Sequence, residues 1–137
     1  MKYELKSTRH AKYLLHVHIV FTPKYRKKIF TKEHLEVMKE VFENICNIND
    51  STLEEFDGEA DHVHLLITYP PRIALSTLVN SLKGVSSRIL RQKFKVFQKE
   101  YWGENVALWS RSYFVASVGG APIDILKEYI ENQKTPD

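Results

Sequence analysis

The sequence predicts an α+β domain in which helices cover one face of an antiparallel sheet. Three observations lead to this class: short segments rich in β-branched and aromatic residues, longer segments whose apolar residues recur at three- and four-residue steps, and turn residues between them. With 137 residues and 43% hydrophobic content, residues 1–137 are expected to form a single compact domain.

The amino-terminal part of the chain predicts a strand followed by a helix. Residues 13–22 (YLLHVHIVFT) are rich in β-branched and aromatic side chains, and Pro23 ends the run. After a basic loop, the apolar residues between 32 and 48 recur with helical spacing, and Thr31 is a candidate N-cap. This helix is the first connection across the sheet.

Two short strands are expected next, over residues 52–56 and 63–69. Asp57-Gly58 lies between them and is a candidate hairpin turn, and Pro70-Pro71 follows the second strand. These residues therefore predict an antiparallel pair.

The carboxy-terminal part predicts a second amphipathic helix over residues 75–90 and a strand over 112–118. The polar side of that helix, which could face a phosphate backbone, carries Lys83, Ser86, Ser87, Arg88 and Arg91. Gly119-Gly120 and Pro122 then precede a terminal helix that extends to about residue 133. The order is βαββαβ plus one helix, which is typical of a ferredoxin-like (RRM-like) antiparallel sheet.

Composition excludes several classes of protein. No apolar run approaches the roughly 18 residues of a membrane span, and residues 1–12 do not resemble a signal peptide, so we expect a soluble, cytoplasmic protein without a membrane partner. Cys46 is the only cysteine, which excludes an internal disulfide and a thiolate zinc site within one chain. The five glycines form no P-loop or dinucleotide fingerprint, so no nucleotide energy source is indicated.

The charge distribution permits nucleic-acid binding. The formal net charge is +3 and the isoelectric point is near 8.9. Basic residues cluster in segments 24–28 and 83–99, where aromatic residues are interleaved with them, a mixture that suits phosphates and unstacked bases. Solvated surface faces give the same pattern, so charge alone does not decide between these interpretations.

Two histidine pairs are candidate metal ligands. His62 and His64 are two residues apart in a predicted strand, so they project from one face with α-carbons roughly 6 to 7 Å apart. Asp61 is placed to bond one imidazole and fix its tautomer. His16 and His18 repeat the spacing, so local geometry leaves open which pair binds metal and which is structural.

The predicted terminal helix offers two further polar side chains. Tyr129 and Gln133 are four residues apart and therefore lie on one helix face. Spacing alone also fits a purely structural interpretation, in which Tyr129 widens the buried face and Gln133 is solvated.

Five motifs together carry a family resemblance. The motifs are KYR (24–26, after His18), HVH (62–64), SLKGVSSR (81–88), LWSRSYF (108–114) and YIENQ (129–133). With these motifs in the same order and at compatible spacings, the chain resembles the single-tyrosine HUH transposases of the insertion-sequence TnpA family over nearly its whole length.

The resemblance implies roles for the candidate residues. It makes His62, His64 and Gln133 the ligands of a divalent metal, Mg²⁺ or Mn²⁺, and makes Tyr129 the nucleophile on a C-terminal catalytic helix. Asp61 then supports the ligands from outside the metal's own shell. His18 matches a family position and stays a candidate auxiliary residue, whereas His16 departs from the pattern.

The resemblance also implies an activity. Such enzymes cleave and rejoin single-stranded DNA at mobile-element ends through a 5′-phosphotyrosine intermediate. They recognise subterminal hairpins and form homodimers in which the tyrosine helix can act in trans. The expected DNA contacts are Lys24, Arg26, Lys83, Arg88 and Arg111.

Three other interpretations of the sequence remain open. A domesticated, repeat-associated tyrosine transposase would use the same residues. A non-catalytic module that binds single-stranded nucleic acid would have structural histidines, with Tyr25 or Phe114 stacked on bases. A metal-dependent nuclease that uses water would release products with no covalent link to protein.

Overall fold

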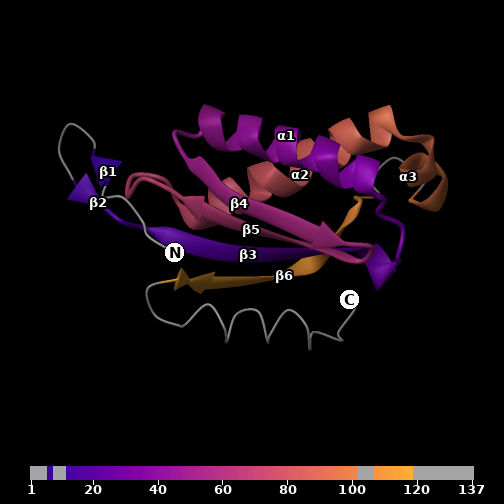
Figure 1. Ribbon diagram of the computed structural model, residues 1–137, viewed down its shortest axis with the longest axis horizontal. Coiled ribbons are helices and arrows are strands. Elements are labelled where there is room, and N and C mark those ends of the chain that lie inside the picture. Colours follow the sequence, from indigo (N-terminus) through magenta and orange to yellow (C-terminus); the bar gives the residue numbers. More distant parts are fainter. Residues whose placement is uncertain (1–5, 8–11, 102–106, 119–137) are drawn as a thin grey trace.

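The computed structural model describes residues 6–7, 12–101 and 107–118. Within these ranges, a two-stranded ribbon precedes a four-stranded sheet with three α-helices (Figure 1). In chain order the elements are β1 (Lys6–Ser7), β2 (Lys12–Tyr13), β3 (His16–Pro23), the 3₁₀ turn η1 (Lys24–Arg26), α1 (Lys32–Ile48), β4 (Thr52–Glu59), β5 (His62–Thr68), α2 (Leu75–Lys93), α3 (Lys95–Glu100) and β6 (Trp109–Ser117).

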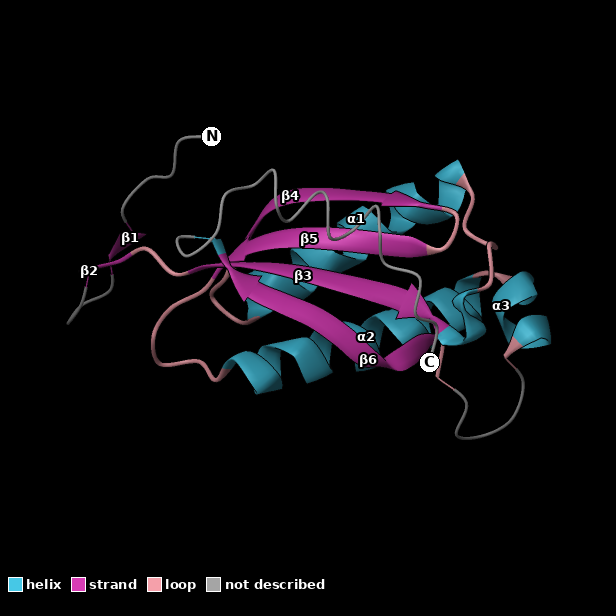
Figure 2. Ribbon diagram, turned by 90° about the horizontal axis from the view of Figure 1, so that it is seen from below, coloured by secondary structure: helices cyan, strands magenta, loops and turns pink. Residues whose placement is uncertain are grey.

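The four-stranded sheet has the order β4-β5-β3-β6, and each neighbouring pair is antiparallel. Along the chain β3-α1-β4-β5-α2-β6, the first and third strands occupy the centre and the second and fourth form the edges. This is the ferredoxin-like arrangement, so the predicted fold class is confirmed. Helices α1 and α2 lie on one face of the sheet (Figures 1 and 2). The predicted terminal helix lies outside the described residues.

Alternate residues of the two central strands build the core against the helices. In β3 and β5 every second side chain belongs to the main buried cluster, while the intervening residues project from the opposite face. Burying each large apolar side chain stabilises the fold by roughly 1.5–3 kcal/mol. The core residues of these strands are Val17, Ile19, Phe21, Val63, Leu65 and Ile67.

Helix α1 begins where its sequence predicts. The Thr31 hydroxyl accepts from the backbone amide of His34, and Nδ1 of His34 accepts from the amide of Thr31, which forms a reciprocal capping box. The helix presents Met38, Phe42 and other apolar residues to the sheet, as its spacing predicts.

The hairpin between β4 and β5 differs from the prediction. Asp57 and Gly58 are not the turn; they are paired within the strands, opposite His64 and Val63. The reversal occurs at Ala60 and Asp61 instead. Gly58 is required for packing here, because a β-carbon at this position would lie 2.9 Å from side-chain atoms of Leu35 and Val63.

Other boundaries shift by a few residues. The first predicted strand divides, because Tyr13 belongs to the separate β1-β2 ribbon and the sheet strand begins at His16. Helix α2 extends to Lys93, strand β6 begins at Trp109, and the short helix α3 was not expected from the sequence.

Candidate metal centre and nucleic-acid surface

The sheet face opposite the helices carries a row of histidines. His16 and His18 of β3 and His62 and His64 of β5 alternate with the core residues, so both pairs project from this one face. The His62 and His64 rings stack with centroids 6.2 Å apart and an interplanar angle of 24°. The His18 ring lies 5.6 Å from that of His64. The strands therefore bring three imidazoles into one group.

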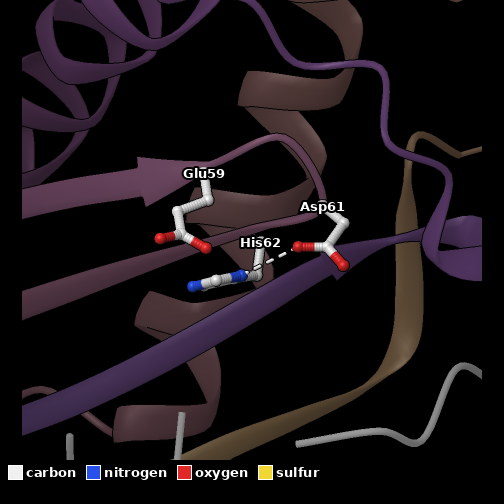
Figure 3. Close-up of side chains that lie close together, drawn as sticks. All are labelled: Glu59, Asp61 and His62. Atoms are coloured by element: carbon white, nitrogen blue, oxygen red, sulfur yellow. Dashed lines mark hydrogen bonds and ion pairs between the residues drawn. The ribbon is translucent and has the colours of Figure 1, made fainter. Parts of the chain in front are cut away.

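Asp61 joins His62 to the turn that follows β3. Its Oδ1 lies 3.0 Å from Nδ1 of His62 (Figure 3). Its Oδ2 accepts from Nε of Arg26 at 3.0 Å. The Arg26 and Asp61 side chains are only 18% and 15% exposed. When His62 donates its Nδ1 proton to this carboxylate, the lone pair at Nε2 is available to a cation.

The surroundings favour the neutral forms of His18 and His64 and the charged form of Asp61. Burial and, to a smaller extent, the neighbouring His64 lower the pKa of His18 to about 4. Burial also lowers the pKa of His64, although the Asp57 carboxylate opposes that shift. Burial alone would raise the pKa of Asp61, but the hydrogen bond from His62 and the positive charge of Arg26 outweigh it, so this pKa lies below its ordinary value. A neutral imidazole is the form that binds metal.

Glu59 adds a carboxylate that sequence reasoning missed. It pairs with His62 across the β4-β5 ladder, and ligand atoms of Glu59, Asp61 and His62 all lie within 4.8 Å of one another (Figure 3). Because Asp57-Gly58 was expected to be the turn, Glu59 was not placed in a strand opposite His62. Oxygen and imidazole donors this close together are compatible with a divalent cation.

The two histidine pairs differ in their bonding. Nδ1 of His16 lies 2.7 Å from the Thr68 hydroxyl, which donates to Glu54 at 3.0 Å, so His16 is part of a structural network. Nε2 of His18 is buried and has no hydrogen-bond partner within the part of the chain that the structure describes. These contacts separate a structural His16 from a His18 whose ring borders the His62–His64 pair.

Tyr129 and Gln133 lie outside the described residues. The structure places His62, His64 and Asp61 together, and the roles of the tyrosine and the glutamine remain predictions.

Three of the five expected DNA contacts, Lys24, Lys83 and Arg111, converge beside the end of β3. Lys24 and Arg111, together with Tyr25, help to line a hollow of about 320 Å³. A second hollow of about 240 Å³ is lined by Lys24, Lys83 and Arg111 among others. We call these two adjoining hollows the basic surface. Nζ of Lys83 donates to the backbone carbonyl of Arg111 at 3.2 Å, which ties α2 to β6 there.

The other two expected contacts lie apart from these hollows. Arg26 faces Asp61. Arg88 is exposed on α2 and lines neither hollow.

Ser86 and Ser87 were expected on a polar, phosphate-facing side of α2, and this was wrong. Both are buried. The Ser86 hydroxyl accepts from Nε1 of Trp109 at 2.9 Å, and that of Ser87 accepts from the Leu108 amide at 2.9 Å. The two serines thus attach α2 to the start of β6.

Fold and site together define a class: a ferredoxin-like α+β protein that carries clustered histidine and carboxylate side chains and, at the end of β3, two hollows lined by basic side chains. The family description "Transposase IS200 like" matches residues 11–133, and the chain belongs to this family. The expected membership of the insertion-sequence transposases is thereby confirmed.

Individual proteins resemble this chain in sequence, in fold or in both. The transposase of insertion sequence IS200 from Salmonella typhimurium is 33% identical over 132 residues, covering 96% of this chain and 85% of the relative. A crystal structure of a protein from Deinococcus radiodurans, provisionally described as a transposase, has a TM-score of 0.80 and 30% identity, with 95% and 98% of the two chains covered. A REP-associated tyrosine transposase bound to a REP hairpin shares the fold at a TM-score of 0.50 and 12% identity, with 92% and 69% covered.

Family membership makes the chain an enzyme of DNA transposition, one that cleaves DNA and transfers strands. Among the described residues, no helix combines the length and apolarity needed to cross a membrane.

Proposed function

We propose that this transposase cuts and rejoins single-stranded DNA at mobile-element ends through a 5′-phosphotyrosine intermediate on Tyr129. The observation that carries the proposal is the pair of stacked imidazoles, His62 and His64, with His62 held by Asp61. The basic surface supports DNA as the substrate. Its Tyr25 is followed in the chain by Arg26, which pairs with the Asp61 that holds His62.

The donor set fits a divalent metal. His62 and His64 would hold it together with Gln133, and the nearby Glu59 and Asp61 carboxylates favour Mg²⁺ or Mn²⁺. When bound, the ion supplies Lewis-acid polarisation of the scissile phosphate. Asp61 holds the His62 ring so that its free nitrogen faces away from the carboxylate. His18 is an auxiliary residue of this site, because its ring borders His64.

The chemistry assigned to Tyr129 is a phosphoryl transfer. The tyrosine loses its phenolic proton as its oxygen forms a bond to phosphorus, and the bond to the 3′ oxygen of the preceding nucleotide breaks, releasing a 3′-hydroxyl. In the second step a DNA 3′-hydroxyl attacks the phosphotyrosine and the tyrosine leaves. The phosphodiester bond energy is retained throughout, so no nucleotide cofactor is required.

DNA contact is assigned to Lys24, Lys83 and Arg111 at the basic surface, with Arg88 and Arg26 as further contacts. Arg26 uses Nε for Asp61, and a guanidinium has other donors for a phosphate. A protein of the same fold has been solved bound to a hairpin, which supports subterminal hairpins as the partner.

The active unit in this proposal is a homodimer in which the tyrosine helix of one subunit acts on the metal ligands of the other. Mixing subunits that carry Tyr129→Phe with subunits that carry His64→Ala tests this arrangement. Trans assembly predicts that the mixture regains activity, provided that both variants fold and dimerise. A mixture that stays inactive would exclude exclusive trans assembly.

The proposal is tested by incubating the protein with Mn²⁺ and labelled single strands that carry candidate element ends, followed by a denaturing gel. We expect a covalent adduct that requires metal and disappears in Tyr129→Phe. Cleavage without an adduct would favour a nuclease that uses water. Binding without cleavage of verified ends would favour a non-catalytic module. Adduct formation on chromosomal palindromes, but not on element ends, would indicate a domesticated enzyme.

A further inference from the structure

The KYR turn after β3 presents an aromatic ring to solvent in an unusual backbone conformation. Tyr25 and Arg26 have φ values of +62° and +49°, in the left-handed region that residues with a β-carbon rarely adopt. The Tyr25 residue is 69% exposed. An exposed aromatic side chain in a strained turn needs a reason that core packing does not supply.

Contacts on every side hold this turn in place. The Lys24 amide donates to the carbonyl of Leu108 at 2.9 Å, and the Lys24 carbonyl accepts from the buried hydroxyl of Tyr101 at 2.8 Å. Arg26 is paired with Asp61, and Lys27 is paired with Glu100 at 2.7 Å. The residues around Tyr25 are therefore fixed before any ligand arrives.

The larger hollow of the basic surface lies beside this ring and has the donors that a nucleotide needs. Its lining is Lys24, Tyr25, Ser110, Arg111 and Ser112. The Ser110 residue is 1% exposed, and its hydroxyl has no hydrogen-bond partner among residues 6–7, 12–101 and 107–118. A buried hydroxyl without a partner is costly unless a ligand or water completes it. The volume of about 320 Å³ is at the lower end of small-ligand pockets.

We propose that this hollow is a nucleotide pocket in which Tyr25 stacks on one unpaired base, while Lys24 and Arg111 bind its phosphates and Ser110 completes a hydrogen bond. The inference rests on the proposed function, because it takes the DNA strand as the ligand. Two cationic side chains, a polar donor and an aromatic face match the separate parts of a nucleotide. An apolar peptide would leave the charges and the hydroxyl unmatched.

The same turn connects the pocket to the metal ligands. Tyr25 and Arg26 are consecutive, and Arg26 contacts the carboxylate that holds His62. A base stacked on Tyr25 would therefore fix the strand close to the residues that act on its phosphate. Tyr25 is a positioning residue in this arrangement and takes no part in bond making.

Three substitutions separate stacking from a structural role. Tyr25→Phe keeps the aromatic ring, and Tyr25→Leu keeps an apolar side chain without a ring. Tyr25→Asn also removes the ring, and asparagine suits the left-handed backbone of this position. Binding is measured by fluorescence anisotropy in EDTA, with labelled single strands that each carry one abasic position. Lys24→Ala serves as the charge control.

We expect Tyr25→Leu and Tyr25→Asn to weaken binding roughly 5- to 150-fold, and Tyr25→Phe to keep it. One abasic position should weaken the wild type by a similar factor and leave Tyr25→Asn unaffected. The slope of log affinity against log salt concentration should stay unchanged in the Tyr25 variants and become shallower by about 0.7 in Lys24→Ala, which loses one phosphate contact.

The pocket would be wrong if folded Tyr25→Asn bound single strands as tightly as the wild type. It would also be wrong if every abasic position changed the affinity of the wild type and of Tyr25→Asn by the same factor. The failure of each proposal is distinguishable. If the wild type forms the covalent adduct but shows no abasic signature, only the nucleotide pocket is wrong. If the abasic signature is present and no adduct forms, the pocket stands and the phosphotyrosine mechanism is wrong.

Discussion

Gly58→Ala tests whether the packing behind His62 and His64 is as tight as the structure shows. A β-carbon at Gly58 would lie 2.9 Å from Cδ2 of Leu35, 2.9 Å from Cγ1 of Val63 and 3.0 Å from the carbonyl oxygen of His62. Leu35 can rotate its side chain, but the β-branched Val63 and the backbone of His62 can yield only if the hairpin shifts. Overpacking of this kind costs about 1–3 kcal/mol in the free energy of unfolding.

Gly84→Ala is the matched control, because the same methyl group meets nothing within 4 Å inside helix α2. Replacing a mid-helix glycine by alanine should raise the free energy of unfolding by about 0.5–1 kcal/mol. The assay is urea unfolding followed by circular dichroism, with both variants measured against the wild type. A Gly58→Ala protein as stable as the wild type would refute the packing argument.

Three further predictions concern single side chains. Asp61→Asn should weaken Mn²⁺ binding, measured calorimetrically, by about 10- to 100-fold, because the carboxylate no longer orients His62; unchanged affinity would contradict this role. Burial lowers the pKa of His34 below its ordinary 6.5, so its contribution to stability is complete above pH 6.5 and is lost as the pH falls through the folded-state pKa. The wild type should therefore lose its advantage over His34→Gln in the free energy of unfolding as the pH is lowered from 7.5 to 5.5. A difference between the two proteins that does not change with pH would contradict this. Ser87→Ala should lower the free energy of unfolding in urea by about 1–3 kcal/mol, because it leaves the buried Leu108 amide without its acceptor. The exposed Ser76→Ala is the control and should be near neutral. Equal effects of the two substitutions would count against the Leu108–Ser87 hydrogen bond.

Periodicity was sufficient to predict the sheet and its two main helices. The apolar spacing and the Thr31 cap defined α1 over residues 32–48, which are the bounds that the structure shows. Alternation in β5 placed His62 and His64 on one face, because a strand reverses its side chains at each residue. These features are local, so the sequence contains them directly.

Features that depend on pairing between distant segments were missed. Asp57-Gly58 has the composition of a turn, yet packing of the partly buried Phe56 against the core and of Gly58 against Leu35 keeps the strand extended to Glu59. Ser86 reads as a surface residue until the Trp109 indole, 23 positions along the chain, is placed against it. The Arg26–Asp61 pair spans 35 positions and has no signature in either segment.

The most direct test of the central claim is to identify which tyrosine carries the DNA. The chain has seven tyrosines, so an adduct alone does not assign the nucleophile. After reaction with an element-end strand and Mn²⁺, nuclease trimming and proteolysis, tandem mass spectrometry should locate a phosphate-linked nucleotide on Tyr129. A nucleotide on Tyr25, or on any other tyrosine, would contradict the account.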